Sequence, residues 1–251
     1  DPFIFLNHHG WQEYPPNNHG LPFGPHPHRG FETVTFILEG DLTHKDSSGA
    51  ISVIKAGGVQ WMTAGAGILH KEYHEKNFAQ NGGPFEMVQL WVNLPKAHKL
   101  TPPKYQALEA ASMSKVMLPE NGGYVNVIAG DLNGTKGSAS TFTEINVFDI
   151  RMNSGGVLST RVPASHNASI LVIDGNAVVN GQQAAKHQFV LFKNEGEEIT
   201  IRANEDSVLL FLSGIPINEP IAQYGPFVMN TQEELQEAFH EYQSGKFGVL
   251  N

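Results

Sequence analysis

Short β-branched and aromatic segments, separated by glycine-containing turns, run through most of this chain. They recur about every 8–12 residues, a spacing typical of β sandwiches and barrels. Only 16% of the 251 residues are charged, whereas Gly contributes 26 and Pro 15. This composition favours strands and turns over long charged helices, so we expect an all-β fold. The expected strands are 33–38, 51–54, 59–63 and 85–93 in the first half, and 169–175, 189–192, 198–202 and 207–213 in the second.

The second half repeats the plan of the first. The segment 169–175 ends in Asp174-Gly175 much as 35–40 ends in Glu39-Gly40, and the two glycines are 135 residues apart. An internal repeat of this length indicates two copies of one β-barrel in tandem. We therefore expect one domain over residues 1–120 and a second over residues 121–251.

Helix signals are few. Thr231 to Glu234 form a capping box, in which each end residue can bond to the other's backbone N–H. Apolar residues then follow at helical spacing and Gly245 closes the segment, so we expect a C-terminal helix near 231–244 in the second domain. A cluster of Ala and Met predicts another helix around 108–116.

Composition also excludes several classes of protein. The chain has no Cys, which excludes a disulfide scaffold, thiolate metal sites and a Cys nucleophile. Its formal net charge of -9 argues against binding to nucleic acid or to an anionic membrane. We see no targeting or membrane-spanning segment and expect a cytoplasmic protein. Because the sequence does not begin with Met, we expect some native N-terminal residues to be absent from it.

Two pairs of metal-ligating residue types stand out, each with one residue between its members. They are His26 with His28, and His70 with Glu72. On a strand, residues i and i+2 face the same side, so each pair can offer two ligands to one metal ion. Either pair alone is more often solvated surface, but two such pairs beside Gly-rich turns in an all-β chain favour a metal site. Imidazole and carboxylate ligands suit Fe, Mn, Ni, Co or Zn.

Several long segments resemble the pirin family of the cupin superfamily. They are His26–Val34, Trp61–Gly65, Gly67–His70, Gln89–Leu94 and Gly225–Asn230, and the resemblance extends over nearly the whole chain. It implies two cupin barrels of jelly-roll type, with a metal in the N-terminal barrel only. The ligand pattern of the family falls on His26, His28, His70 and Glu72. In the second barrel, the positions that correspond to His26 and His28, counted back from Gly175 as from Gly40, are Arg161 and Pro163. The second barrel therefore lacks this pair of ligands.

Four further residues are candidates for the substrate pocket or for contacts beside the ligands. Phe23 lies in a Pro/Gly-rich loop next to His26, and Trp61 could line the pocket, although barrel core is the simpler reading for Trp61 and Trp91. Glu32 would share strand parity with His26 and His28. His74 follows His70 by four residues and is expected beside the ligands or at the surface.

The resemblance implies quercetin 2,3-dioxygenase activity, the opening of a flavonol ring by O2 with release of CO. The cofactor would be one divalent ion, Fe(II) before Mn, Ni, Co or Zn, and the substrate a small flavonol-like aromatic molecule. We expect Glu72 to be the catalytic base if it can release or share the metal, because no other carboxylate except Glu32 has a suitable spacing. The main alternative is a regulator that responds to iron redox state and binds a transcription factor or metabolic enzyme. A third is a cupin of different chemistry, such as an isomerase or a metal store, because fold and ligands do not determine the reaction.

Overall fold

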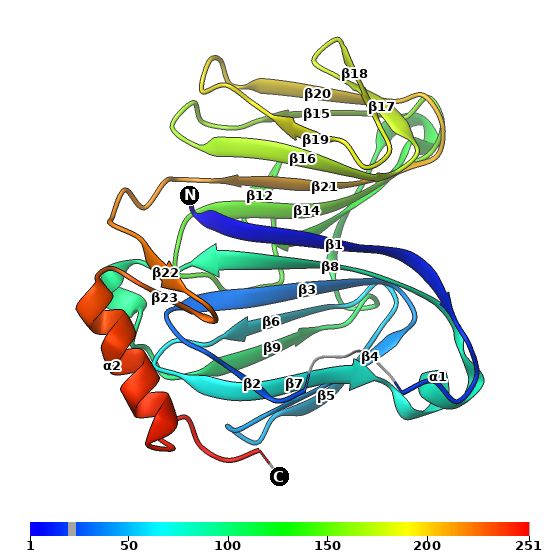
Figure 1. The fold of residues 1–251 in the computed structure, drawn as a ribbon. Helices are drawn as coiled ribbons and strands as arrows, with labels where there is room; N and C mark the ends of the chain where they lie inside the picture. The colour runs from blue at the N-terminus through cyan, green and yellow to red at the C-terminus, as the bar shows by residue number, and fades with distance from the viewer. Residues whose placement is uncertain (20–23, 251) are drawn as a thin grey trace. The chain divides into compact units, whose positions relative to one another are not determined.

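The structure is a computed structural model that describes residues 1–19 and 24–250 (Figure 1). Contacts divide the chain into two compact units. One, the N-terminal unit, contains residues 2–111 together with 217–251, and the other, the central unit, contains Asp1 and residues 112–216. This differs from the expected division at 120/121, because the chain after residue 216 packs with the first barrel instead of continuing the second.

The N-terminal unit is built from two antiparallel sheets. The first has five strands in the order β1 (Phe3–Tyr14), β8 (Gly83–Asn93), β3 (Phe31–Glu39), β6 (Val59–Thr63) and β9 (Lys104–Leu108). The second has four, in the order β2 (His26–His28), β7 (Ile68–His74), β4 (Asp41–Asp46) and β5 (Ile51–Lys55). The unit also contains α1 (Lys76–Asn81), the 3-10 turn η1 (Lys96–His98), the hairpin β22 (Ala222–Tyr224) and β23 (Phe227–Met229), and α2 (Gln232–Gln243).

The central unit repeats this two-sheet plan. Its six-stranded sheet has the order β10 (Ser114–Met117), β11 (Gly123–Ala129), β14 (Ile145–Met152), β21 (Ser207–Gly214), β16 (Asn167–Asp174) and β19 (Phe189–Leu191). Its four-stranded sheet has the order β15 (Val157–Arg161), β20 (Glu198–Ala203), β17 (Asn176–Val179) and β18 (Gln182–Ala185). The short hairpin of β12 (Asp131–Leu132) and β13 (Thr135–Lys136) and the 3-10 turn η2 (Pro119–Asn121) complete it.

Apolar side chains fill the interior of the central unit. Phe148 and Phe211 stack with ring centroids 5.3 Å apart within a large cluster of buried aliphatic side chains. Arg161, at the position expected for a lost ligand, is exposed and pairs with Glu197. The interior of this barrel is therefore an ordinary packed core, and burial of apolar surface stabilises it.

The expected C-terminal helix is confirmed, with its capping box. The Thr231 hydroxyl accepts from the N–H of Glu234, and the Glu234 carboxylate accepts from the N–H of Thr231. The helix predicted at 108–116 is wrong. β9 ends at Leu108 and β10 begins at Ser114, because pairing of β9 with β6 and of β10 with β11 overrides the helical preference of Ala and Met. Among the described helices, none is both long and apolar enough to cross a bilayer.

Candidate metal centre

The three histidines of the predicted site come together on two neighbouring strands. β2 pairs antiparallel with β7, and His26 lies directly opposite His70 in the register. The imidazole centroids are 4.3 Å apart for His26 and His70, 4.8 Å for His26 and His28, and 4.9 Å for His28 and His70. The ligand-capable nitrogens of all three lie within 4.8 Å of one another, close enough to share one ion.

Backbone carbonyls fix the tautomers of two of these rings. Nδ1 of His26 is 2.9 Å from the Gly24 carbonyl oxygen, and Nδ1 of His28 is 3.3 Å from that of Pro226. Because a carbonyl oxygen only accepts, each Nδ1 carries the hydrogen, and each lone pair lies on Nε2. Metal-binding histidines usually show this arrangement, in which the second ring nitrogen donates to a neighbouring acceptor.

Burial keeps the imidazoles of His28 and His70 neutral. Burial, together with the charge of His26, lowers the pKa of His28 to about 3. The pKa of His70 is held well below its ordinary value by burial and by the neighbouring histidines. Neither ring nitrogen of His70 has a hydrogen-bond partner, although the side chain is fully buried. Neutral imidazoles with unused lone pairs are the form that metal ions require, so these residues fit the expected ion.

Glu72 lies on the same face of β7 as His70 and is also buried. One carboxylate oxygen accepts from Thr35 at 3.2 Å and from Gln60, and the other accepts from Gln89 at 3.2 Å. These donors orient the carboxylate. Ligand-capable atoms of Glu72 and His70 also lie within 4.8 Å of one another. His70 is therefore close both to the other two histidines and to Glu72.

Sequence reasoning missed one histidine at this site. His44 is fully buried on β4, directly opposite Glu72 in the register, and groups with His70 and Glu72 within 4.8 Å. Its Nε2 is 2.9 Å from a carboxylate oxygen of Asp46. His44 and Asp46 have the same one-residue spacing as His26 and His28, so the rule that selected those two could also have selected this pair.

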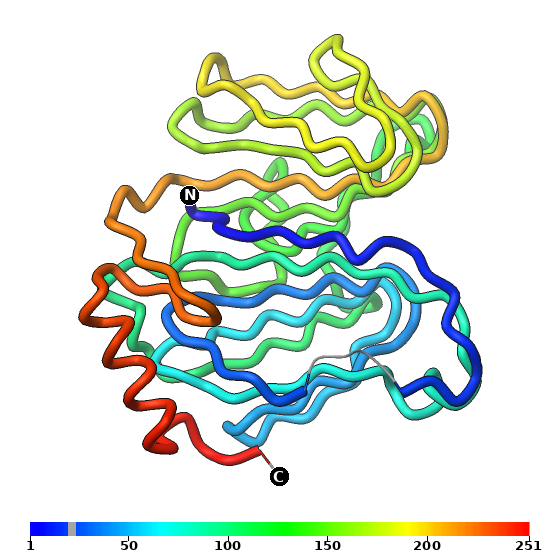
Figure 2. The backbone as a smooth tube through the Cα atoms, viewed as in Figure 1, coloured from blue at the N-terminus to red at the C-terminus, as the bar shows by residue number. Residues whose placement is uncertain are grey.

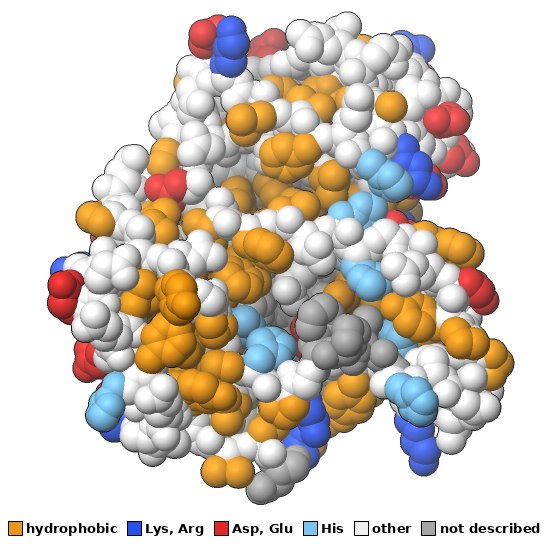
Figure 3. All heavy atoms as spheres, viewed as in Figure 1, with side chains coloured by type: hydrophobic (Ala, Val, Ile, Leu, Met, Phe, Trp, Pro, Cys, Tyr) orange, Lys and Arg blue, Asp and Glu red, His pale blue; other side chains and the backbone are white. Residues whose placement is uncertain are grey.

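A cavity of about 280 Å³ opens beside the histidines. It is lined by His26, His28 and Glu72 together with Asn7, Met87, Gln89, Trp91, Gly225 and Pro226. Trp91, read from the sequence as barrel core, therefore lines the cavity, with its ring 5.5 Å from that of His28. The face in Figure 3 carries histidine side chains beside a hydrophobic region. The cavity combines a polar end with an apolar wall, as small-molecule sites usually do.

The structure brings the other predicted residues to different places. Phe23 lies outside the described residues. Thr35 and Gln60 bond to Glu72, so their strand neighbours on the opposite face, which include Glu32 and Trp61, point away from the ligands. Glu32 instead accepts from Thr63 at 2.7 Å. Its expected parity with His28 is wrong, because the chain turns at Gly30 (φ 86°) between β2 and β3.

His74 is neither at the surface nor in the two groups that could hold a metal ion. It is 3% exposed, and its ring lies 4.5 Å from Tyr14 and 4.7 Å from Phe85. Burial, together with the charge of His9, lowers the pKa of His74 to about 4. Nδ1 is 2.7 Å from the side-chain oxygen of Asn18. The residue therefore belongs to an aromatic cluster further along β7.

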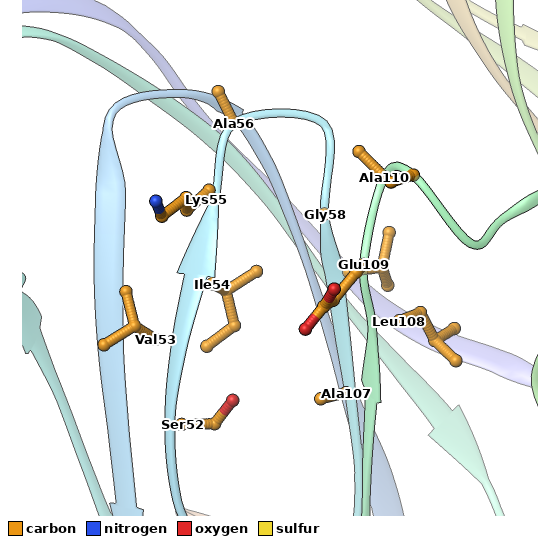
Figure 4. Close-up of a pocket in the computed structure, with 12 residues that line it drawn as sticks. Ser52, Val53, Ile54, Lys55, Ala56, Gly58, Ala107, Leu108, Glu109 and Ala110 are labelled. Atoms are coloured by element: carbon orange, nitrogen blue, oxygen red, sulfur yellow. The ribbon is translucent and has the colours of Figure 1, made fainter.

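A second cavity, of about 430 Å³, lies between the edge strands β5 and β9 (Figure 4). Apolar side chains such as Ile54 and Leu108 line it, together with Lys55 and Glu109. The described residues around it include no histidine, and none of the four predicted ligands contributes to its wall. Although it is larger, it lacks the chemistry of the first cavity.

The C-terminal segment completes the candidate centre. The segment with β22 and β23 runs beside the chain between β2 and β3 (Figure 2). There Arg29 and Phe227 form an isolated parallel β-bridge, and the N–H of Val228 donates to the Arg29 carbonyl. Lys99, 2% exposed, donates to the carbonyls of Gly30 and Val228 at 2.9 and 3.0 Å. These bonds hold the Pro226 carbonyl near His28.

The chain forms two double-sheet barrels in tandem. One carries a cluster of His and Glu residues, the other has an apolar core, and this arrangement is that of a bicupin. Two family models match the chain, Pirin over residues 1–92 and the Pirin C-terminal cupin domain over residues 147–248. The chain is 42% identical over 246 residues to a Pseudomonas aeruginosa protein named "Putative quercetin 2,3-dioxygenase PA2418", covering 98% of this chain and 86% of that protein. It is 40% identical to Pirin-1 of Arabidopsis thaliana, covering 90% of this chain and 78% of the relative.

A crystal structure of quercetin 2,3-dioxygenase from Acinetobacter baumannii matches with a TM-score of 0.95 and 46% identity, covering 100% of this chain and 88% of that one. The Escherichia coli pirin YhhW, crystallised in complex with nickel(II), shares the fold at a TM-score of 0.68 and 22% identity, over 86% of this chain and 83% of that one. The chain belongs to the pirin family.

Proposed function

We propose that this pirin is a mononuclear metal-dependent dioxygenase that opens the ring of flavonols, in the manner of a quercetin 2,3-dioxygenase. The observation that carries the proposal is a group of three imidazoles, of His26, His28 and His70, whose ligand-capable nitrogens lie within 4.8 Å of one another. The buried carboxylate of Glu72 is equally close to His70, and a cavity opens beside the group. The relatives named for this activity, at 42% and 46% identity, support the same reaction.

In this proposal His26, His28, His70 and Glu72 hold one divalent ion, with Fe(II) as the first choice and Mn, Ni, Co or Zn as alternatives. When bound, the ion supplies Lewis acidity toward the flavonol hydroxyl and a site for reaction with O2. A ligand set of this kind leaves coordination positions open, as a reactive metal site requires.

The protein's own residues bind the substrate and move its proton. Trp91 and Met87 offer an apolar wall to an aromatic ring, while Asn7 and Gln89 can bond to its oxygen substituents. Glu72 takes the proton of the flavonol hydroxyl. Both atoms of O2 enter the products, one carbon of the ring leaves as CO, and the ring-opened ester retains the rest. The cavity of about 280 Å³ is near the lower end of the range for small-molecule sites, roughly 300–1,000 Å³.

The test is turnover of quercetin in air by the iron-reconstituted protein, followed by the loss of its visible absorbance and by release of CO. We expect metal-dependent bleaching that His28→Ala abolishes. A matched control is His240→Ala, which removes a histidine of α2 that lies in neither metal-binding group. If the protein holds iron but consumes no O2 with flavonols, the proposal fails, and the redox-responsive regulator becomes the better hypothesis.

A further inference from the structure

The three candidate histidine ligands differ in how their second ring nitrogen is satisfied. Metal-binding histidines almost always donate that N–H to a carbonyl or carboxylate, which fixes the ring and makes it a stronger ligand. Gly24 serves His26 in this way, and Pro226 serves His28. His70 has no such partner at either nitrogen, although it is completely buried. A metal bound to one of these nitrogens leaves the other N–H in need of an acceptor.

His44 can supply that acceptor. Its Nε2 is 2.9 Å from Asp46, and since a carboxylate only accepts, the hydrogen is on Nε2. In the neutral ring the lone pair then lies on Nδ1, which has no hydrogen-bond partner. Asp46 is itself held firmly, because its other oxygen accepts from the N–H and the hydroxyl of Ser48 at 2.8 and 2.6 Å. The pair thus presents a buried acceptor backed by a fixed carboxylate.

The position of His44 fits this role. Strands β4 and β7 are neighbours, and the His44 and His70 rings have centroids 5.5 Å apart. Two imidazoles joined by a hydrogen bond of ~2.9 Å have centroids roughly 5 Å apart, so a small rotation of either ring closes the bond. Tyr105 stacks on His44 at 4.4 Å with an interplanar angle of 19° and restricts the plane of the ring.

We propose that His44 is a positioning residue that accepts the second N–H of His70, so that a buried relay runs from Asp46 through His44 and His70 to the metal. The inference rests on the proposed function only in requiring a metal at His70, and not on flavonol turnover. Through two polarised rings, the carboxylate would make His70 a stronger electron donor. That would favour the more highly charged oxidation state of a bound iron.

The experiment uses the full chain loaded with Co(II), whose paramagnetism shifts the imidazole N–H protons of bound histidines out of the crowded NMR spectrum. We expect three exchangeable, shifted N–H signals in the parent protein. Asp46→Asn should move one of them, and His44→Phe should move it or lose it to solvent exchange. The metal dissociation constant should rise about 10–100-fold in both variants, as for other residues that orient metal ligands. In the iron-loaded protein, the Fe(III)/Fe(II) potential should become more positive.

The controls separate positioning from folding and from ligation. His166→Gln removes another buried histidine, in the central unit, and should leave all three readouts unchanged. Asp46→Asn keeps the size of the side chain, and His44→Gln replaces His44→Phe if the latter does not fold. Unchanged N–H signals and an unchanged dissociation constant in the variants would overturn the inference. Pulsed EPR of the Cu(II)-loaded protein counts bound imidazoles, and a lower count in His44→Phe would overturn it too, by making His44 a ligand.

Discussion

His26 and His70 face each other across the antiparallel strands β2 and β7, with their ring centroids 4.3 Å apart. This one pairing joins two sequence motifs that lie more than forty residues apart. Because side chains alternate along each strand, it also brings His28 and Glu72 to the same side of the sheet. The candidate metal centre is therefore a consequence of strand register, and changes that disturb the register should disturb the metal.

Metal loading should stabilise the fold. An ion that binds only the folded state stabilises it by about 2.7 kcal/mol when its free concentration is 100 times the dissociation constant. We expect a higher unfolding temperature with Fe(II) or Ni(II) than with a chelator, measured by calorimetry under anaerobic conditions. His70→Ala should remove this difference. A metal-dependent shift that survives in His70→Ala would place binding elsewhere.

Glu72→Gln should separate metal binding from turnover. The amide keeps the shape of the side chain, while the three histidines continue to hold the ion. General acid–base catalysis contributes roughly 10²–10⁴-fold to rates, so kcat should fall by at least about 100-fold. The matched control is Glu86→Gln on the adjacent part of β8, whose side chain pairs with His8. Full turnover with bound metal in Glu72→Gln would show that Glu72 is not the base.

Glu32 should make stability depend on pH. Burial raises its pKa from 4.5 to about 7 in the folded protein. Below about pH 4.5 both folded and unfolded chains hold the proton, and Glu32 has no effect. Between about 4.5 and 7 the folded state binds the proton and the unfolded state releases it, so stability falls as pH rises. Above pH 7 the decrease in the free energy of unfolding is constant, on the order of 3 kcal/mol.

Glu32→Gln should remove this loss. Urea unfolding should give the variant and the parent similar free energies at pH 4, and a more stable variant at pH 8. The amide oxygen can still accept from Thr63. Equal effects at both pH values would contradict a raised pKa for this carboxyl. Glu120→Gln, at an exposed position, controls for the loss of one surface charge.

Gly30→Ala should damage both the fold and the metal site. Gly30 has φ of 86°, and a Cβ there would lie 1.9 Å from the Val228 carbonyl oxygen. Gly49 has a similar φ of 97° but open space around the position of a Cβ. Gly49→Ala should therefore lower the free energy of unfolding by only about 1 kcal/mol, because Ala adopts this backbone conformation less readily than Gly. Gly30→Ala should cost several times more and weaken metal binding, because the clash displaces the segment that holds Pro226 near His28. Equal losses in the two variants would contradict this account.

Much of the candidate site could be predicted from local patterns. His26 with His28, and His70 with Glu72, follow from the two-residue period of a strand, and the glycine-bounded apolar segments predicted most of the strands around them. The capping box at Thr231 likewise needed only four neighbouring residues, since its bonds are made within one turn of helix. Each of these features depends on interactions between residues close together in the chain.

The contributions that sequence reasoning missed depend on distant contacts. His44 and Asp46 have the one-residue spacing of the predicted pairs, but spacing does not show that they are buried. The pairing of β4 with β7 places them beside His70. The sequence pattern predicts Trp91 as barrel core, and only the folded structure shows that its side chain lines the cavity.

By itself, therefore, the sequence determined the strand pattern, the two-barrel plan, the pairs of candidate ligands and the pirin family. The tertiary structure decided that the C-terminal segment returns to the first barrel, that Pro226 contacts His28 and that Glu32 faces away from the ligands. The physical reason is that strand period is a local property of the backbone, whereas register, burial and side-chain partners are determined when segments far apart in the chain pack together.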